Sequence, residues 1–175
     1  MNILPYHLPE VLYLPYDDQL PRVAEMLEMA IKAALPDLEV DHIGSTSIPG
    51  MPGKNSLNLV VLCSRDRFPA VLKLLEDLGF QNHPFKHEPA DRPLKVGSIE
   101  HGGKLYGIHV HVLEKDSDNH RNSLFFRDYL RSHPDEAKQY AELKRSLVGR
   151  KMSSEEYNAA KQPFILEILV KRDLN

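Results

Sequence analysis

Hydrophobic residues in the first half of the chain follow helical and strand-like spacings in turn. Apolar positions recur every three or four residues from about Asp18, a candidate N-cap, to Pro36, which predicts a helix with Pro21 in its first turn. A second helical pattern covers residues 66–78 and ends at Gly79. Prolines interrupt the segment before the first helix, so we expect an extended arm wrapped on the surface.

Five further stretches have the composition of β-strands. The stretch 57–63 is nearly all apolar, as expected for a strand that is covered on both faces. Two others are separated by a glycine-containing turn and predict a hairpin. The predicted strands are residues 39–43, 57–63, a short segment from Phe80 onward, 92–99 and 104–113, with the turn at 100–103.

The chain after about Asn119 has the spacing of helices throughout. The first predicted helix covers residues 119–132, and the second covers 134–148 with a proline in its first turn. Ser153 opens the third, three residues before Glu156, as in a capping box. Pro163 should bend or split this last helix.

Together these elements predict an α/β (α+β) fold with a mixed sheet of about four or five strands, flanked by helices, and a helical C-terminal third. One domain over residues 1–175 is expected, since no linker divides the chain. A net charge of −3 argues against a nucleic-acid binder. The single cysteine, Cys63, permits no intrachain disulfide. Because the chain also lacks a signal-peptide pattern and an apolar stretch near ~20 residues, we expect a cytoplasmic protein without a membrane partner.

A glycine- and proline-rich loop follows the first predicted strand. Such residues are common in turns, so a purely structural turn is one interpretation. A Gly-Ser turn can also cradle phosphate groups, and here Gly44 permits close approach while Ser45 and Thr46 supply hydroxyls. Lys54, after the loop, is placed to contact a phosphate as a point charge.

This loop, His42-Ile43-Gly44-Ser45-Thr46-Ser47-Ile48-Pro49-Gly50, resembles the signature loop of the GrpB family, which is placed in the nucleotidyltransferase-like superfamily. Further blocks match the family in the same order, from about residue 40 to residue 170. They are His109-Val110-His111, residues 126–131, His133-Pro134, Tyr140 with Lys144, and Tyr157 with Lys161. The resemblance implies a nucleotidyltransferase-like fold that binds a nucleotide or another phosphate-bearing small molecule.

Acidic residues are missing where the resemblance implies a metal site. Nucleotidyl transfer needs a divalent metal such as Mg²⁺ or Mn²⁺, held by two acids one residue apart and by a third on a neighbouring strand. Here the two positions read Asn58 and Val60, and the neighbouring strand offers His109 and His111, which share one face. An amide brings no negative charge, so a metal site built on Asn58 should be weak. The resemblance still assigns these three polar residues to the reacting end of the site.

Zinc is an alternative for the two histidines, because imidazole suits transition metals better than Mg²⁺. A third ligand would come from Asp41, His42, His87 or Glu88, and the spacing selects none of them. The other interpretation is that both histidines are hydrogen-bonding residues lining a cleft.

Arg127 and Arg131 are four residues apart on a predicted helix, so their guanidinium groups emerge on one face. Two such groups can bind phosphate or carboxylate, and the family match supports a place in the pocket. A solvated surface paired with nearby acids is the alternative. The pairs Tyr140 with Lys144 and Tyr157 with Lys161 repeat the four-residue spacing, and we expect the tyrosines to pack in the interior.

Two functions therefore remain open. One is transfer of a nucleotidyl group to a small acceptor, and the other is a non-catalytic module that binds a nucleotide or a coenzyme A-related ligand. The second is suggested because some GrpB-like domains occur attached to a kinase of coenzyme A biosynthesis. Ser45 with His42 or His109 would be a nucleophilic pair, but the Gly-x-Ser-x-Gly turn is absent.

Overall fold

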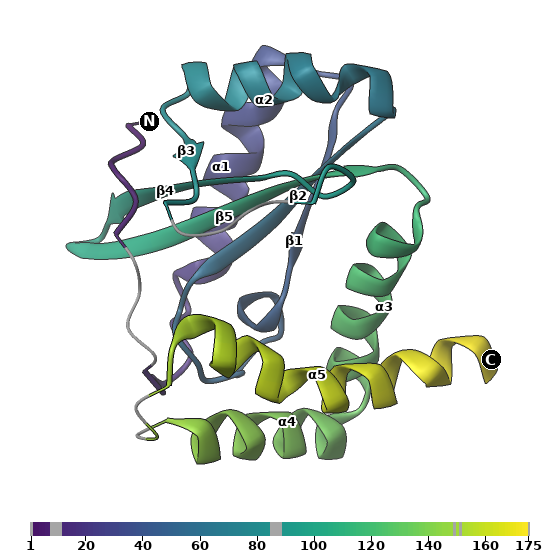
Figure 1. Ribbon diagram of the computed structural model, residues 1–175. Helices are drawn as coiled ribbons and strands as arrows, with labels where there is room; N and C mark the ends of the chain where they lie inside the picture. The colour runs from purple at the N-terminus through teal and green to yellow at the C-terminus, as the bar shows by residue number, and fades with distance from the viewer. Residues whose placement is uncertain (1, 8–11, 85–88, 149, 151, 175) are drawn as a thin grey trace.

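The sheet at the centre of the fold is mixed, as the sequence predicts. The computed structural model describes residues 2–7, 12–84, 89–148, 150 and 152–174. Its five strands lie in the order β1-β2-β5-β4-β3 (Figure 1). Strands β2 and β5 pair in parallel, while the other neighbours are antiparallel. The strands are β1 (Glu39–Ile43), β2 (Leu57–Cys63), β3 (Gln81–Asn82), β4 (Leu94–His101) and β5 (Lys104–Glu114).

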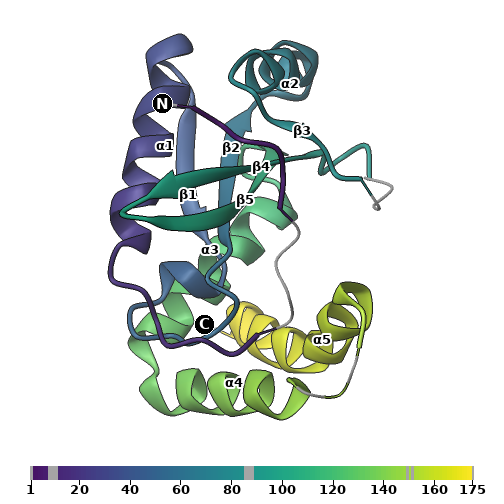
Figure 2. The same cartoon turned by 90° about the vertical axis from the view of Figure 1, so that its left-hand side faces the viewer.

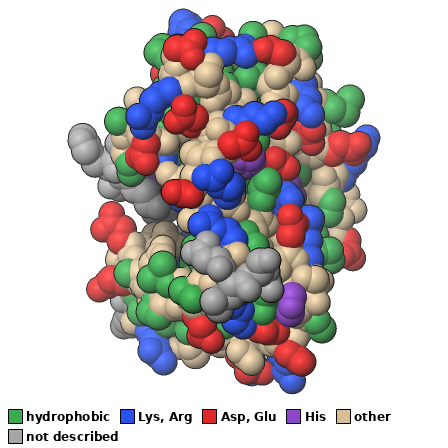
Figure 3. Space-filling model, turned by 90° about the vertical axis from the view of Figure 1, so that its right-hand side faces the viewer, with side chains coloured by type: hydrophobic (Ala, Val, Ile, Leu, Met, Phe, Trp, Pro, Cys, Tyr) green, Lys and Arg blue, Asp and Glu red, His purple; other side chains and the backbone are tan. Residues whose placement is uncertain are grey.

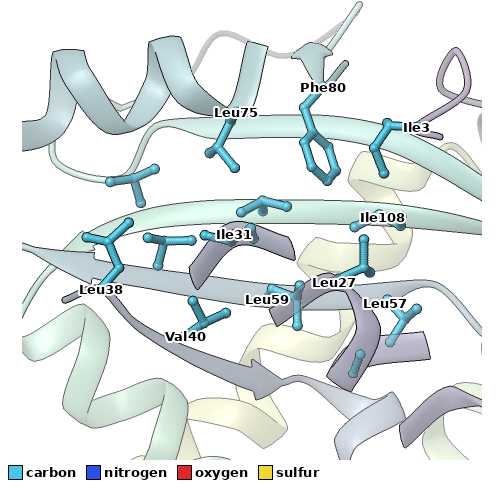
Figure 4. Close-up of a cluster of buried hydrophobic side chains, with 14 of the residues drawn as sticks. Ile3, Leu27, Ile31, Leu38, Val40, Leu57, Leu59, Leu75, Phe80 and Ile108 are labelled. Atoms are coloured by element: carbon cyan, nitrogen blue, oxygen red, sulfur yellow. The ribbon is translucent and has the colours of Figure 1, made fainter. Parts of the chain in front are cut away.

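One face of the sheet is covered by α1 (Leu20–Ala34) and α2 (Phe68–Asp77). Alternate residues of β2 and β5 point to this side because side chains alternate along a strand. Figure 4 shows the resulting core, where strand residues such as Leu59 and Ile108 meet Leu27 of α1. Helix α1 begins at Leu20 with Gln19 as its N-cap residue, not with the predicted Asp18. The helix predicted over 66–78 is a short 3₁₀ turn followed by α2.

The remaining residues of β2 and β5 form the opposite face, and they change character along the strands. Asn58 lies beside His109, and Val60 lies beside His111. At the far end of the same face, Leu62 and Leu113 join a small apolar cluster with Leu124. Asn58 is therefore the one polar residue in the otherwise apolar strand β2, and its side chain lies on the face of the sheet away from α1.

Three helices form the C-terminal layer on this second side: α3 (Asp118–Ser132), α4 (Pro134–Leu147) and α5 (Ser154–Val170) (Figure 1). They share an apolar cluster of their own, built around Phe126, Tyr140 and Ile168. Ser153 and Glu156 form the predicted capping box of α5. Pro163 lies inside α5, so the prediction that it splits this helix is wrong. No helix of the described residues is long and apolar enough to span a membrane.

The N-terminal segment is extended, as predicted, but part of it enters the core. Figure 2 shows this segment passing the β4–β5 hairpin on its way towards α1. Leu4 forms a bridge with Ser98 of β4, and Ile3 is buried in the main core. Gly97 makes room for this contact, because a Cβ atom there would lie 2.5 Å from Cγ2 of Ile3. Ile3 thus fixes the arm to the core, while most of its other described residues lie at the surface, as predicted.

Candidate functional site

A cavity of about 570 Å³ lies between the polar part of the sheet and the C-terminal helices. The sheet contributes Asn58, His109 and His111 to its lining. The loop after β1 and the segment before β2 contribute Gly44, Ser45, Lys54 and Ser56. Helices α3, α4 and α5 supply the opposite wall, including Asn119, Tyr140, Lys144, Tyr157 and Lys161. Most of the residues predicted for the site are therefore brought together here.

The loop after β1 turns sharply at Gly44, which has φ +73°. A Cβ atom on Gly44 would lie 3.4 Å from Nδ2 of Asn58, so glycine allows the loop to approach the strand closely. Ser45 opens a 3₁₀ turn, η1 (Ser45–Ser47), and lines the cavity beside Gly44. The sequence thus places Gly44 and Ser45 at the cavity through a turn that requires a positive φ.

Thr46 lies behind the loop and does not line the cavity. Its hydroxyl is hydrogen-bonded to Nε2 of His42 at 2.9 Å and donates to the carbonyl of Ser56 at 3.4 Å. Burial, reinforced by the charges of Arg131 and Arg127, lowers the pKa of His42 to about 4. His42 is therefore neutral at physiological pH. Both side chains stabilise the loop from inside the protein.

Arg127 and Arg131 also support this loop from behind, and neither lines the cavity. Nε and Nη2 of Arg131 both donate to the carbonyl of Ser47, at 3.0 and 2.7 Å. Nη1 of Arg127 donates to the carbonyl of His42 at 3.1 Å. Arg127 also forms ion pairs with Asp41 and Asp128. The two guanidinium groups share one helix face, as predicted, but that face meets the outside of the loop.

Lysine side chains bring positive charge to the cavity from three separate elements. Lys54 comes from the segment before β2, Lys144 from α4 and Lys161 from α5. Nζ of Lys54 and Nζ of Lys161 lie 5.0 and 4.5 Å from the centre of the Tyr157 ring. Nζ of Lys144 lies 5.0 Å from the centre of the Tyr140 ring. The repeated Tyr–Lys spacing therefore marks two of the three cations, and the packing of α4 and α5 brings both to the cavity.

Lys144 is the most deeply buried of these cations, with 2% of the residue exposed. Its ammonium group donates to the carbonyl of Pro52, and a Cβ atom on Gly53 would lie 3.3 Å from Nζ. Burial, followed by the charge of Lys161, lowers the pKa of Lys144 to about 7. Near neutral pH both the charged and the neutral form of this lysine are therefore populated.

His109 is held at both ring nitrogens. Its Nε2 is hydrogen-bonded to the hydroxyl of Tyr6 at 2.8 Å, and its Nδ1 is 3.3 Å from the hydroxyl of Ser56. The rings of Tyr6 and His83 pack against it, with centroids 5.4 and 6.2 Å away. Tyr6, Ser56 and His83 were not predicted, since they come from distant parts of the chain. No described hydrogen bond joins Ser45 to His42 or His109, so the pairing expected of a nucleophilic serine is not formed.

The residues present do not fit a divalent metal. Among the described residues that line the cavity there is no aspartate or glutamate. Val60, at the second position expected for an acid, is fully buried. Within the described part of the chain, no group of three His, Cys, Asp or Glu side chains is arranged to hold a metal ion. His87 and Glu88, two of the candidate zinc ligands, lie outside the described residues.

The charge inside the cavity differs from that of the surface. Figure 3 shows the side of the molecule that carries α3, where blue basic and red acidic side chains alternate. The described lining of the cavity, by contrast, includes the basic residues Lys54, Arg92, Lys144 and Lys161 and no aspartate or glutamate. A low-dielectric cleft with one sign of charge concentrates ions of the opposite sign.

Comparison with known proteins identifies relatives of this chain. A family model described as GrpB protein matches residues 10–171. A UPF0157 protein of Pseudomonas aeruginosa is 34% identical over 162 residues, which cover 89% of this chain and 65% of that protein. A UPF0157 protein of Vibrio cholerae is 32% identical over 142 residues, covering 81% of this chain and 71% of the relative. The chain thus matches about two thirds of the length of these relatives.

Solved structures agree with the sequence relatives. The crystal structure of the conserved protein GrpB from Enterococcus faecalis has a TM-score of 0.73 at 25% identity, covering 92% of this chain and 99% of that one. A structure of the Cid1 poly(U) polymerase with MgGTP bound has a TM-score of 0.51 at 18% identity. That match covers 74% of this chain and 45% of the polymerase chain. The second likeness shows a shared fold of the nucleotidyltransferase-like kind.

Proposed function

Since the chain belongs to the GrpB family and has a nucleotidyltransferase-like fold, we propose that it binds a phosphate-bearing small molecule, such as a nucleotide, in the cavity between the sheet and α5. The proposed binding needs no divalent metal. Lysine ammonium groups neutralise the phosphates in its place.

The observation that carries this proposal is the gathering of lysine ammonium groups from three separate elements in one cavity. Lys54 and Lys161 share the Tyr157 ring, and Lys144 enters from the neighbouring helix. Like charges in one cleft repel each other, and a bound anion would reduce that repulsion. Phosphate groups suit such a site, because charge-assisted hydrogen bonds to lysine are stronger than neutral ones. Ser45 adds a hydroxyl donor at the same wall.

A nucleotide is the ligand class that the structural likeness supports. The Cid1 polymerase, which shares the fold, was solved with MgGTP bound. Neutral hydrogen-bonding groups suited to a base or sugar also line this cavity, namely Asn58, Asn119, Asn122, Asn158 and Gln162. These amides can orient the base or sugar of a ligand without adding charge, and the lysines supply the charge that attracts its phosphates.

Nucleotidyl transfer is the second candidate function, and the fold favours it. Its orthodox form needs two acids on β2, where this chain has Asn58 and Val60. The geometry therefore supports binding better than metal-assisted transfer. The two candidates differ in their dependence on metal, which makes them separable.

Thermal shift and calorimetry with ATP, GTP and inorganic tripolyphosphate, each in Mg²⁺ and in EDTA, test the proposal. We expect each ligand to raise the melting temperature by the same amount in EDTA as in Mg²⁺, because the described lining of the cavity has no carboxylate that could bind the metal. Lys54→Gln and Lys161→Gln should each weaken binding by at least tenfold, as expected when a charge-assisted hydrogen bond worth about 1.5–3 kcal/mol is lost. Lys138→Gln removes an exposed lysine of α4 outside the cavity and is the matched control.

Stabilisation that appears only with Mg²⁺ would favour the transferase, and product analysis would follow. The binding proposal is overturned if none of the three probes raises the melting temperature in either condition. It is equally overturned if Lys138→Gln weakens binding as much as the two cavity variants do.

A further inference from the structure

Arg92 lies in the same cavity at a different level of the sheet from Lys54. It lies two residues before Leu94 of β4, and Leu94 pairs with His111 of β5. Lys54 lies three residues before Leu57 of β2, and Leu57 pairs with Ile108 of β5. Ile108 and His111 are three residues apart, which corresponds to roughly 10 Å along a strand. The two cations therefore enter the cavity at separate positions along its length.

The side chain of Arg92 has no partner among the described residues of the kind that Arg131 has. Its Nε is buried, and no hydrogen bond or ion pair of the Arg92 side chain is formed in the part of the chain that the structure describes. Burial lowers the pKa of Arg92, opposed by the charge of Asp91. Asp91 itself accepts a hydrogen bond from Asn119 at 3.2 Å. By comparison, Arg131 donates twice to one carbonyl.

A buried N–H donor without a partner is costly, and Nε of Arg92 is such a donor although the residue as a whole is only half-buried. The guanidinium group remains protonated in proteins, so the cost cannot be relieved by loss of the proton. Buried donors are almost always satisfied in native proteins, and each exception requires an explanation. The same cavity is lined by the neutral side chains of Asn119, Asn122 and Ser123, and Asp91, whose charge acts on Arg92, is hydrogen-bonded to Asn119. An oxyanion of the ligand would satisfy Arg92 and use these neutral groups as further donors.

We propose that Arg92 forms a second anion subsite, so that the ligand of this cavity is a small molecule with two separated anionic groups, one bound by the lysines and one by Arg92. The inference rests on the proposed function for the lysine end only. The group at Arg92 is a phosphate or a carboxylate, since a guanidinium group binds either with two parallel hydrogen bonds.

Three probes with one common part separate these possibilities. AMP carries one phosphate, adenosine 3′,5′-bisphosphate adds a second phosphate, and adenylosuccinate adds carboxylates to the base. Dissociation constants are measured in EDTA for the unmodified protein, Arg92→Gln, Arg92→Lys and Lys161→Gln. Arg145→Gln, which removes an exposed arginine of α4 outside the cavity, is the charge-matched control.

We expect at least one doubly anionic probe to bind at least tenfold more tightly than AMP. Arg92→Gln should abolish that advantage while leaving the affinity for AMP within twofold. Arg92→Lys should restore part of it, and Lys161→Gln should weaken all three probes alike. The melting temperature of unliganded Arg92→Gln should equal or exceed that of the unmodified protein, because the buried Nε donor, which has no partner among the described residues, has been removed.

The inference is overturned if both doubly anionic probes bind no better than AMP, or if Arg92→Gln weakens AMP to the same degree. Inorganic phosphate distinguishes this failure from failure of the proposed function. If AMP does not bind but phosphate raises the melting temperature, and Arg92→Gln abolishes that shift, the lysine site is wrong and the Arg92 subsite stands. If neither AMP nor phosphate has any effect, both proposals fall.

Discussion

Asn58 of β2 lies directly beside His109 of β5, in the register of two parallel strands. The amide thus stands next to an imidazole that is already held by Tyr6 and Ser56. A carboxylate at position 58 would introduce the first acid into the described lining of the cavity. The side chain at this position therefore sets the charge that the polar part of the sheet presents to a bound anion.

Asn58→Asp should weaken the binding of ATP in EDTA by roughly tenfold. Two like charges about 10 Å apart repel by about 1.7 kcal/mol at an effective dielectric constant near 20, which exceeds a factor of ten. Mg²⁺ should not reverse the loss, because Val60 supplies no second acid. Calorimetry with and without Mg²⁺ measures both effects, and Asn58→Ala controls for loss of the amide. Tighter, Mg²⁺-dependent binding by the aspartate variant would instead support the transferase.

Arg131→Ala should destabilise the protein by about 1–2 kcal/mol, because the Ser47 carbonyl loses both of its guanidinium donors. The free energy of unfolding is measured by urea denaturation. Arg121→Ala, which removes an exposed arginine from the same helix, should change it by less than about 0.5 kcal/mol. Unchanged stability with lost nucleotide binding would place Arg131 at the ligand and contradict its supporting role.

The arginines show where the sequence is sufficient and where it is not. A spacing of four residues establishes that Arg127 and Arg131 share a helix face, and the structure agrees. Which neighbour that face meets depends on how α3 packs on the sheet, and the helical period does not contain this information. Local periodicity was also sufficient in the strands. Side chains alternate along β5, so the sequence shows that His109 and His111 point to the same side of the sheet.

The lysine cluster and Tyr6 could not be predicted for a related reason. Lys54, Lys144 and Lys161 come from three elements that are distant in sequence, and only their packing brings the charges together. Tyr6 reaches His109 because the N-terminal segment is fixed on β4, where Gly97 leaves space for Ile3. Such long-range placement has no local sequence pattern, whereas the capping box at Ser153 depends on neighbouring residues alone and was predicted correctly.

His42 should make the protein sensitive to acid between about pH 6.5 and pH 4. Its pKa is lowered to about 4 in the folded protein, chiefly by burial, while the unfolded value is about 6.5. In that window the unfolded state binds more protons, so the free energy of unfolding falls as the pH falls. His42→Gln should flatten this part of the profile in urea denaturation.

Thr46→Val is the control for this prediction. It removes the hydroxyl that bonds His42 but leaves the ring buried, so stability should fall by about 1 kcal/mol at every pH while the slope persists. Equal slopes for His42→Gln and the unmodified protein would show that His42 is not the group responsible.

Lys144 should couple binding of the proposed ligand to protonation. Burial and the charge of Lys161 lower its pKa to about 7, so it loses its proton as the pH rises above neutrality. An anion bound in the cavity favours the charged form and raises the pKa again. Binding above pH 7 must then take up a proton. By linkage, affinity is constant where the lysine is already charged and falls by up to tenfold per pH unit above that point.

Calorimetry with AMP in EDTA between pH 7.5 and pH 9 tests this coupling, because a phosphate monoester has a second pKa of about 6 and its charge changes little in that range. We expect affinity to fall with pH and the heat to depend on the ionisation enthalpy of the buffer, which reports proton uptake. Lys144→Met should bind more weakly at pH 7.5 and lose both dependences. Lys161→Gln should keep them but move the fall in affinity to higher pH, because the charge that lowers the pKa of Lys144 is gone. If Lys144→Met retains the pH dependence of the unmodified protein, another group takes up the proton and Lys144 does not contact the bound anion.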